Sequence, residues 1–317
     1  MSDQTLPLLV THSGKFHCDE VFAYVVLRLA LGLGPDEHRL VRTRDPAVIA
    51  QGDVVWDVGS LYDEASNRFD HHQRGAPARD DGTPFSAAGL VWRRYGSEAV
   101  GALLGSKALA DAFATAIATE IDDTFVRRID ELDNGVVAER DTLGFASLIG
   151  DFNPSWDAPG GEGQADAAFL QAVAMAEGVL RRRVESLRSR LAAEAIVVAA
   201  QAASLDPRIL ELERGMPWKN AVFAHDLPVA YAIYPVSNGN WMVDSMPPEA
   251  GSFDQRIPLP QAWAGLPEAE LAAASGVADA VFVHLRRFVG AAKTRTGAMT
   301  MAQKAIAISE GAVTSVA

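Results

Sequence analysis

The sequence predicts an α/β protein with a mostly parallel sheet in its N-terminal domain, a helical connector and a smaller α+β C-terminal domain. Three observations lead to this fold class. Short apolar runs alternate with helical patterns up to about residue 60, a segment rich in glycine and proline lies at 153–165, and strand-like runs predominate after Pro207. Such alternation is typical of a parallel sheet covered by helices. We therefore expect domains at 1–160 and 206–317, joined by a helical connector at 161–205.

The first domain begins with an apolar run at 6–12 that ends in a polar loop, which predicts a buried strand. From Asp19 onward, apolar residues recur at intervals of three and four, the pattern of a helix that the glycines of LGLGPDE end. Runs at 40–43 and 53–59 predict two further strands, and Pro46 opens a short helix between them. The run at 53–59 is apolar on both faces, as strands of parallel sheets tend to be.

The remaining elements follow from the same patterns. A hairpin-like segment leads to Asp70, and helices are expected at 86–104, 108–128 and about 165–203. The later strands are expected in RILELE, PVAYAIYP, NWMVDSM and DAVFVH, before a closing helix at about 296–308. The aromatic residues of this half are expected to pack in its core: Trp218, Trp241, Phe253 and Trp263.

Composition limits the class of function. The 317 residues carry a net charge of −13, which argues against broad binding of a nucleic-acid backbone but leaves room for a local site where metal ions neutralise a phosphate. The single cysteine excludes an internal disulfide framework and suits a reducing compartment. The N-terminus lacks the basic and apolar regions of a secretory signal, and no apolar run is long enough to span a membrane. We expect a cytoplasmic protein.

Residues that bind metals gather where strands are expected to end. His12 ends the first strand, Asp57 the third, and "RFDHHQRG" places a carboxylate beside two imidazoles. The C-terminal ends of parallel strands are where α/β sheets usually hold ligands. The candidates are His12, His17, Asp19, Asp57, Asp70, His71 and His72. Mixed Asp and His ligands suit Mn²⁺, and two such ions about 3.5–4 Å apart would activate water and clamp a phosphoryl group.

Each of these residues also has a structural interpretation. A histidine at a strand end is more often a hydrogen-bonded structural residue than a ligand, and Asp57 before Gly59 could cap a turn. The structural interpretation must account for every residue separately, so their joint occurrence favours a metal site.

A further carboxylate is expected downstream. Asp122 and Asp123 could be part of a solvated helix face, whereas Asp130 and Asp133 lie three apart on one face of a helix. The turn at Asn134-Gly135 could aim Asp133 into the cleft. We predict that Asp133 is the direct ligand and that Asp130 orients Asp133 or a histidine.

These motifs resemble a known family. "FDHHQRG", with "THSGKFHCDE" and "DVVWDVG" upstream, is similar to the DHH phosphoesterase superfamily, named for its Asp-His-His triplet. More narrowly, the chain resembles the MYG-type exonucleases almost end to end, through "VRTRDP", "SAAGLVW", "IDELDNG", "NPSW", "GMPWK", "SFDQRIPLP", "SGVADAVFVH" and "TRTGAMTMA". The resemblance implies a two-domain phosphoesterase that binds two Mn²⁺ ions, with Mg²⁺ or Co²⁺ as alternatives, and that acts as a 3′–5′ exonuclease on RNA.

The resemblance also implies roles for residues. His12, His17, Asp19 and His71 match metal ligands, although most of the superfamily has Asp where this chain has His17. Asp57 and Asp70 fit the bridging and terminal carboxylates. His72 matches a phosphate contact or general acid, so the catalytic pair would be His72 and Asp70. The full ligand set is then His12, His17, Asp19, Asp57, Asp70, His71 and Asp133.

The C-terminal domain resembles a substrate-binding module. Its motif reads "FVHLRRFVGAAKTRTGA", in which Ala291 replaces a second glycine that would let an anion approach the backbone. Lys293 and Arg295 are expected to pair with a substrate phosphate, unless they are ordinary surface charges. The expected substrate contacts are His72, Arg74, His284, Lys293 and Arg295.

We therefore expect a metal-dependent phosphodiesterase that shortens RNA or short oligonucleotides from the 3′ end, without a membrane partner; a homodimer is compatible with the sequence. One alternative is a small-substrate phosphatase that acts on pyrophosphate or a nucleoside bisphosphate, which the acidic composition favours. Another is a regulator that binds metal or nucleotide without turnover.

Overall fold

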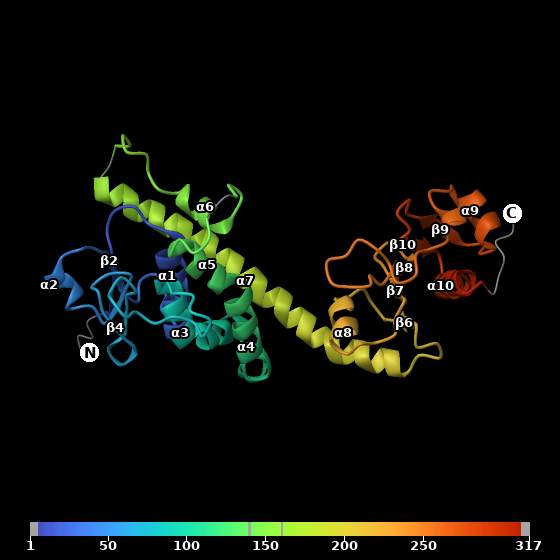
Figure 1. The fold of residues 1–317 in the computed structure, drawn as a ribbon, viewed down its shortest axis with the longest axis horizontal. Coiled ribbons are helices and arrows are strands. Elements are labelled where there is room, and N and C mark those ends of the chain that lie inside the picture. Colours follow the sequence, from blue (N-terminus) through green and yellow to red (C-terminus); the bar gives the residue numbers. More distant parts are fainter. Residues whose placement is uncertain (1–5, 139–140, 160, 312–317) are drawn as a thin grey trace. The chain divides into compact units, whose positions relative to one another are not determined.

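The computed structural model describes residues 6–138, 141–159 and 161–311, and it divides into two compact units (Figure 1). Unit 1 is Met1–Arg188 and unit 2 is Ser189–Ala317, so the division falls inside the long helix α7 (Gly161–Ala202). Each unit contains its own five-stranded mixed sheet with helices, which makes the protein α/β. Because α7 begins at Gly161, the expected linker at 153–165 is shorter than predicted; residue 160 lies outside the described residues.

The sheet of unit 1 has the strand order β2-β1-β3-β5-β4. Its strands are β1 (Leu8–Thr11), β2 (Arg39–Arg42), β3 (Val54–Trp56), β4 (Tyr62–Asp63) and β5 (Arg68–Phe69). The pairings β1–β2, β1–β3 and β3–β5 are parallel, and only β4–β5 is antiparallel. The loops that follow β1, β2, β3 and β5 therefore leave the same edge of the sheet.

The helices of unit 1 confirm the main helical predictions. They are α1 (Cys18–Leu31), α2 (Pro46–Ile49), α3 (Ala87–Leu104), α4 (Lys107–Ile121), a π-helical turn (Asp122–Val126), α5 (Arg127–Asp133), α6 (Phe145–Gly150) and the part of α7 up to Arg188. Helix α1 is buried from Cys18 to Leu27 and packs against α3. It ends at Gly32, which adopts the left-handed conformation (φ 64°) that a glycine reaches without strain. The single helix expected at 108–128 is instead three consecutive helical segments, and α6 was not predicted.

One strand is shorter than its apolar pattern suggests. The run at 53–59 predicted a strand through Gly59, but β3 ends at Trp56. Asp57 and Gly59 have positive φ angles of 54° and 99°, and a residue in that region cannot continue a strand. The chain therefore turns sharply at Asp57.

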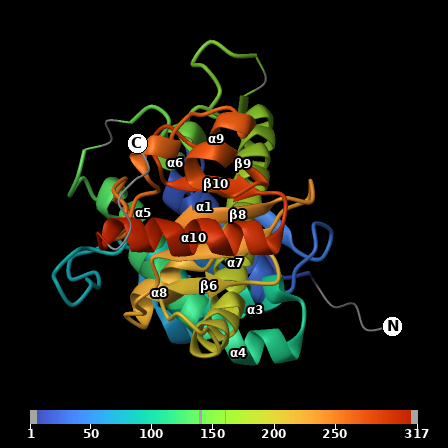
Figure 2. The same cartoon turned by 90° about the vertical axis from the view of Figure 1, so that its right-hand side faces the viewer.

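The sheet of unit 2 has the order β6-β7-β8-β10-β9. Its elements are β6 (Ile209–Glu211), α8 (Lys219–Ala224), β7 (Tyr231–Pro235), β8 (Trp241–Ser245), a 3-10 turn (Gln261–Trp263), α9 (Glu268–Ser275), β9 (Ala280–Val283), β10 (Val289–Ala292) and α10 (Arg295–Ser309). Helix α10 packs along strands β7, β8 and β10 (Figure 2). The predicted strands and closing helix are present, whereas α8, α9 and β10 were not predicted.

Two expectations about apolar surface can be compared with the structure. Trp218 and Trp263 are buried as expected, but Phe253 is 81% exposed, so its assignment to the core was wrong. Among the described residues, none of the helices combines the length and the apolar character needed to cross a membrane.

Candidate metal centre

The first ligand-type residues lie between β1 and α1. His12 directly follows β1, and His17 is the residue that precedes the first turn of α1. The Glu20 carboxylate accepts a hydrogen bond from the backbone N–H of His17 at 2.9 Å, which satisfies a donor at the helix start. The same Oε2 atom lies 2.6 Å from His12 Nε2, so one buried carboxylate holds both the loop and the imidazole.

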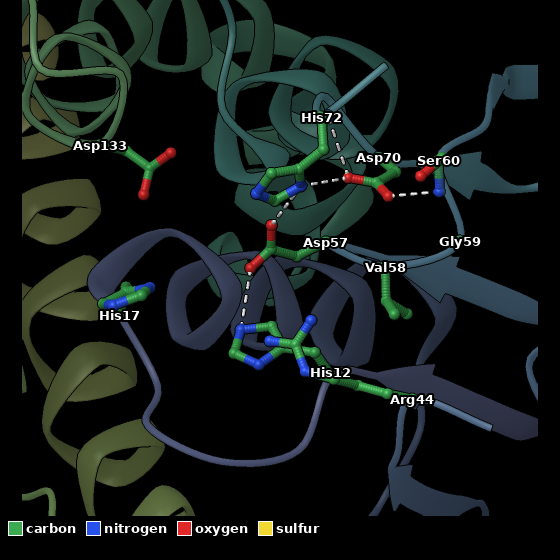
Figure 3. Close-up of a pocket in the computed structure, with 10 residues that line it drawn as sticks. All are labelled: His12, His17, Arg44, Asp57, Val58, Gly59, Ser60, Asp70, His72 and Asp133. Carbon is green, nitrogen blue, oxygen red and sulfur yellow. Dashed lines mark hydrogen bonds and ion pairs between the residues drawn. The ribbon is translucent and has the colours of Figure 1, made fainter.

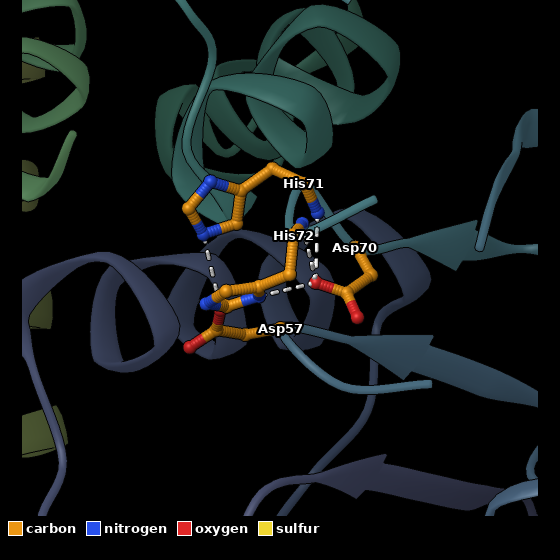
Figure 4. Close-up of side chains that lie close together, drawn as sticks. All are labelled: Asp57, Asp70, His71 and His72. Atoms are coloured by element: carbon orange, nitrogen blue, oxygen red, sulfur yellow. Dashed lines mark hydrogen bonds and ion pairs between the residues drawn. The ribbon is translucent and has the colours of Figure 1, made fainter. Parts of the chain in front are cut away.

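The Asp-His-His triplet follows β5 directly. Oδ1 of Asp70 accepts hydrogen bonds from the backbone N–H groups of His71 and His72 at 2.8 and 3.2 Å and lies 2.7 Å from His72 Nδ1. Oδ2 of Asp70 accepts from the backbone N–H of Ser60 at 2.6 Å. Both oxygens of Asp70 are therefore engaged within the protein, and the contacts of Oδ1, drawn in Figure 4, fix the turn that carries the two histidines.

Asp57 stands between the histidines. Its Oδ1 lies 3.3 Å from His71 Nε2 and its Oδ2 lies 3.2 Å from His12 Nε2. His71 Nε2 is also 4.0 Å from Asp19 Oδ2. The structure thus brings the loops after β1, β3 and β5 to one place. The sequence predicted that ligand-type residues would gather at these strand ends.

The structure separates Asp133 from Asp130. Asp133 Oδ2 lies 3.4 Å from His71 Nε2, at the last residue of α5. Asp130 is fully buried and faces away from this cluster: its oxygens accept from Ser86 N–H (3.0 Å), Ser86 Oγ (2.7 Å) and the Arg79 guanidinium (2.7 and 2.9 Å). Asp130 therefore holds the region of α5 against the start of α3 and the loop that contains Arg79, instead of contacting Asp133 or a histidine directly.

Four buried carboxylate oxygens in the cluster accept no hydrogen bond among the described residues: both of Asp19, Oε1 of Glu20 and Oδ1 of Asp57. Leaving such atoms unsatisfied is costly, because a buried charge needs a partner. Ligand atoms of several combinations lie within 4.8 Å of one another, including Asp19 with Glu20 and Asp57, and Asp57 with Asp70, His71 and His72. Oxygen-rich donors with imidazole nitrogens fit a divalent cation of the Mn²⁺ type.

The electrostatics of the cluster agree with this fit. Burial, reinforced by the negative charges of Asp57 and Asp133, raises the pKa of Asp19. Burial lowers the pKa of His12, but the contacts with Asp57 and Glu20 outweigh it and raise that pKa to about 10. Without a cation, protonated His12 therefore supplies part of the positive charge that balances the carboxylates of this centre.

The cluster opens into a cavity of about 310 Å³, the metal-site cavity, drawn in Figure 3. It is lined by His12, His17, Arg44, Asp57, Val58, Gly59, Ser60, Asp70, His72 and Asp133. The side chains of His17 and His72 are 60% and 59% exposed, whereas those of His12 and Asp57 are nearly buried. Arg44 forms no ion pair with any residue in the described part of the chain, so its charge is available to a ligand.

Sequence reasoning missed two residues of this centre, Glu20 and Arg44, and also Arg79, which holds α5 in place through Asp130. Glu20 adjoins the recognised Asp19, and its place three residues after His17 is the spacing of a capping box, which is the signal that could have revealed it. Arg44 lies in the loop after β2, at the same sheet edge as the candidate ligands. Arg79 gave no local signal, because its partners Asp122 and Asp130 are more than 40 residues away.

The other residues that were expected to contact the substrate lie outside this cluster. Lys293 Nζ lies 2.9 Å from Glu268 Oε2, and the Arg295 guanidinium forms an ion pair with both oxygens of Glu211. His284 is exposed and accepts a hydrogen bond from the Arg286 N–H. Arg74 is exposed in unit 1. Ala291 is buried in β10, where Gly290 packs closely against Phe282 and Leu259, so these two small residues fit the packing of the sheet.

Comparison with known proteins gives a consistent result. The family model described as "Uncharacterised protein family (UPF0160)" matches residues 8–306. A MYG1 protein of Caenorhabditis elegans is 35% identical, and the match covers 96% of this chain and 96% of that protein. The MYG1 exonuclease of Homo sapiens is 34% identical over 95% of this chain and 86% of its own length. A MYG1 protein of Schizosaccharomyces pombe is 31% identical over 94% and 97%. No solved structure matches the chain significantly.

Proposed function

Because this chain belongs to the MYG1 family, we propose that it is a divalent-metal-dependent phosphodiesterase that removes nucleotides from the 3′ end of RNA or short oligonucleotides. Relatives named exonucleases support a nuclease-type function. We further propose that 1–160 form a DHH-type phosphoesterase domain, 161–205 a connector and 206–317 a substrate-binding domain.

The observation that carries the proposal is the group of buried carboxylate oxygens without a hydrogen-bond partner, beside histidines from two other strand ends. We propose that the ions are held by His12, His17, Asp19, Asp57, His71 and Asp133, and that Glu20 contributes to the same charge. When bound, two Mn²⁺ ions would polarise a phosphoryl oxygen and lower the pKa of a water molecule.

The chain's own residues would position the substrate and handle protons. Asp70 Oδ1 accepts from His72 Nδ1, which leaves His72 Nε2 to face the metal-site cavity. In that orientation, the imidazolium form of His72, which carries a proton on both ring nitrogens, would contact the scissile phosphate and give the Nε2 proton to the leaving oxygen. The Arg44 guanidinium would neutralise phosphate charge at the mouth of the same cavity. In this proposal Asp70 orients His72 and contributes to catalysis through it, because both of its oxygens are already engaged.

A second candidate is a small-substrate phosphatase acting on pyrophosphate or a nucleoside bisphosphate. The observation in its favour is the net charge of −13, which disfavours a long polyanion more than a small one.

One parallel assay tests both candidates. Purified protein with Mn²⁺ is offered a 5′-labelled oligoribonucleotide, the same strand labelled at its 3′ end, pyrophosphate and a nucleoside bisphosphate. A 3′–5′ exonuclease gives a descending ladder from the 5′-labelled strand and releases labelled mononucleotide at once from the 3′-labelled strand, and chelation stops both. Turnover of pyrophosphate or bisphosphate, without turnover of the oligonucleotide, would contradict the exonuclease and support the phosphatase. If none of the substrates is turned over, both candidates are contradicted, and the protein binds metal or nucleotide without catalysis.

A further inference from the structure

Trp156 is the most exposed tryptophan in the described chain, with 97% of its surface accessible. It lies in the loop between α6 and α7, light green in Figure 1. By contrast, Trp56, Trp92, Trp218 and Trp263 are buried. An indole that gains nothing from core packing is well suited to contact a ligand, because its whole face is free to stack.

The exposed indole borders a cavity. This cavity, which we call the Trp156 cavity, has a volume of about 540 Å³. Its lining combines the indole with Lys15 and Gly14 of the β1–α1 loop, Asn153 and Ser155 of the α6–α7 loop, and Gln164 of α7. A space of this size accommodates a nucleotide base, and the Gln164 amide can pair with the edge of a base.

The α6–α7 loop, which carries Trp156, is hydrogen-bonded to the β1–α1 loop, which carries His12 and His17. Asn153 Oδ1 accepts from the Phe16 backbone N–H at 2.9 Å, and Asn153 Nδ2 donates to the Phe16 carbonyl at 2.8 Å. Arg42, whose side chain is 2% exposed, donates to the Gly14 carbonyl at 2.7 Å on the other side of this loop. The position of Trp156 relative to His17 is therefore set by a pair of hydrogen bonds three residues from the indole.

A third cavity shares lining residues with both the Trp156 cavity and the metal-site cavity. This intermediate cavity, of about 440 Å³, is lined by residues that include Lys15, His17, Asp19, Asp133 and Gly150. It shares His17 and Asp133 with the metal-site cavity, and Lys15 and Gly150 with the Trp156 cavity. Residues shared by neighbouring cavities therefore lead from the candidate metal ligands to the indole, and all of them lie in unit 1.

Lys15 supplies the positive charge on this path. It is exposed, and it forms no ion pair with another residue of the described ranges. In a chain with a net charge of −13, an unpaired lysine beside a cavity and within two residues of His17 is suited to a phosphate group.

We propose that Trp156 is a base-stacking platform for single-stranded nucleic acid. The base of a nucleotide a short distance from the scissile phosphate stacks on the indole, and Lys15 contacts the intervening phosphate. The inference deepens the proposed exonuclease function and rests on it. It also gives that function a preference for an unpaired strand, since a base within a duplex cannot stack on the indole.

The test pairs protein variants with substrates that lack one base. Wild-type protein, Trp156→Ala and Trp156→Phe are each given an oligoribonucleotide and a series with a single abasic residue at successive positions from the 3′ end. Trp156→Ala should raise KM for the intact strand roughly 5- to 150-fold, the range expected for one stacked base. Trp156→Phe should recover most of this loss. In wild-type protein, one abasic position should raise KM similarly, and in Trp156→Ala that position should have no further effect.

Leu143→Ala is the matched control, because Leu143 is also a large apolar residue of unit 1, 79% exposed, and lines none of the three cavities. It should leave KM unchanged. Equal KM for wild type and Trp156→Ala, or an abasic effect that persists in Trp156→Ala, would overturn the stacking platform while the exonuclease remained. If wild-type protein degrades no oligonucleotide, both proposals fall together.

Discussion

Asp57 adopts a left-handed backbone conformation, with φ at 54°, and its side chain contacts two histidines from different loops. Such a conformation is unfavourable for most residues, though Asn and Asp tolerate it best. Strained residues of this kind cluster at functional sites. The conformation lets β3 end abruptly and turns the carboxylate between His12 and His71.

We predict that Asp57→Asn lowers metal-dependent turnover by at least ~100-fold, because it removes a charge that the ions would need. The free energy of unfolding should fall by about 1–3 kcal/mol, because His12 and His71 lose a charged partner. Asp57→Ala should be equally inactive and less stable by a further ~1 kcal/mol, because alanine is strained at positive φ. Steady-state kinetics and denaturant unfolding measure the two effects. Wild-type turnover in Asp57→Asn would show that Asp57 is not a ligand.

We predict that metal binding depends on pH through His12. Its pKa is raised from 6.5 to about 10 in the folded protein, so its contribution to stability is fully present below pH 6.5 and is lost as pH rises through about 10. A cation must displace this proton, so apparent metal affinity should rise with pH, by up to about tenfold per unit for each proton released. Calorimetry at pH 7 in buffers of different ionisation enthalpy should detect release of at least one proton. Binding without proton release would contradict the role of His12.

Helix α5 carries two aspartates with different tasks, Asp133 beside His71 and Asp130 beside Arg79 and Ser86. Asp133→Asn should lose binding of one ion with little change in stability. Asp130→Asn should weaken metal affinity only ~10–100-fold, through displacement of α5, and should lower the free energy of unfolding by about 1–3 kcal/mol. Metal titration and thermal unfolding of both variants separate the roles. The reverse order of metal affinities would refute the assignment.

The packing of α3 against α5 leaves no room for a side chain at Gly89. A Cβ atom there would lie 2.3 Å from Asp130 Oδ1 and 2.6 Å from Oδ2, so Gly89→Ala must displace a buried carboxylate that Arg79 and Ser86 hold. We expect a loss of about 1–3 kcal/mol in the free energy of unfolding. Gly178→Ala in α7 is the control, because no atom lies within 4 Å of the new Cβ. This change should raise the free energy of unfolding by roughly 0.5–1 kcal/mol. Equal stability of the two variants in denaturant unfolding would mean that the contact at Gly89 relaxes freely.

At the scale of the whole molecule, the net charge of −13 limits how strongly a nucleic acid can be held by its backbone. With Arg44 and Lys15 as the phosphate contacts, log KM for a single strand should rise with log salt with a slope of about 1.4. Kinetics across a series of KCl concentrations at fixed Mn²⁺ measure this slope. A slope above about 4 would show that an extended basic surface binds the strand instead.

Local sequence patterns predicted most elements and the convergence of the site, because ligand-type residues at the ends of parallel strands must meet at one edge. The patterns failed where distant contacts decide the structure. The apolar run through Val58 predicted a longer β3, but the site requires a turn at Asp57. Arg79 forms its ion pairs with residues more than 40 positions away. The proposed stacking role of Trp156 depends on a contact between Asn153 and Phe16. No local pattern encodes such pairs.

The contact between Phe16 and Asn153 also sets an order of events during synthesis, because 137 positions separate the two residues. At about 5–20 residues per second, a ribosome needs roughly 7 to 27 s to cover that distance. Throughout this interval the nascent chain carries His12 and His17 without the loop geometry that Asn153 provides. The proposed metal centre would therefore be complete only after Asn153 has been made, and a chain stalled before that point would present His12 and His17 to any free metal ion.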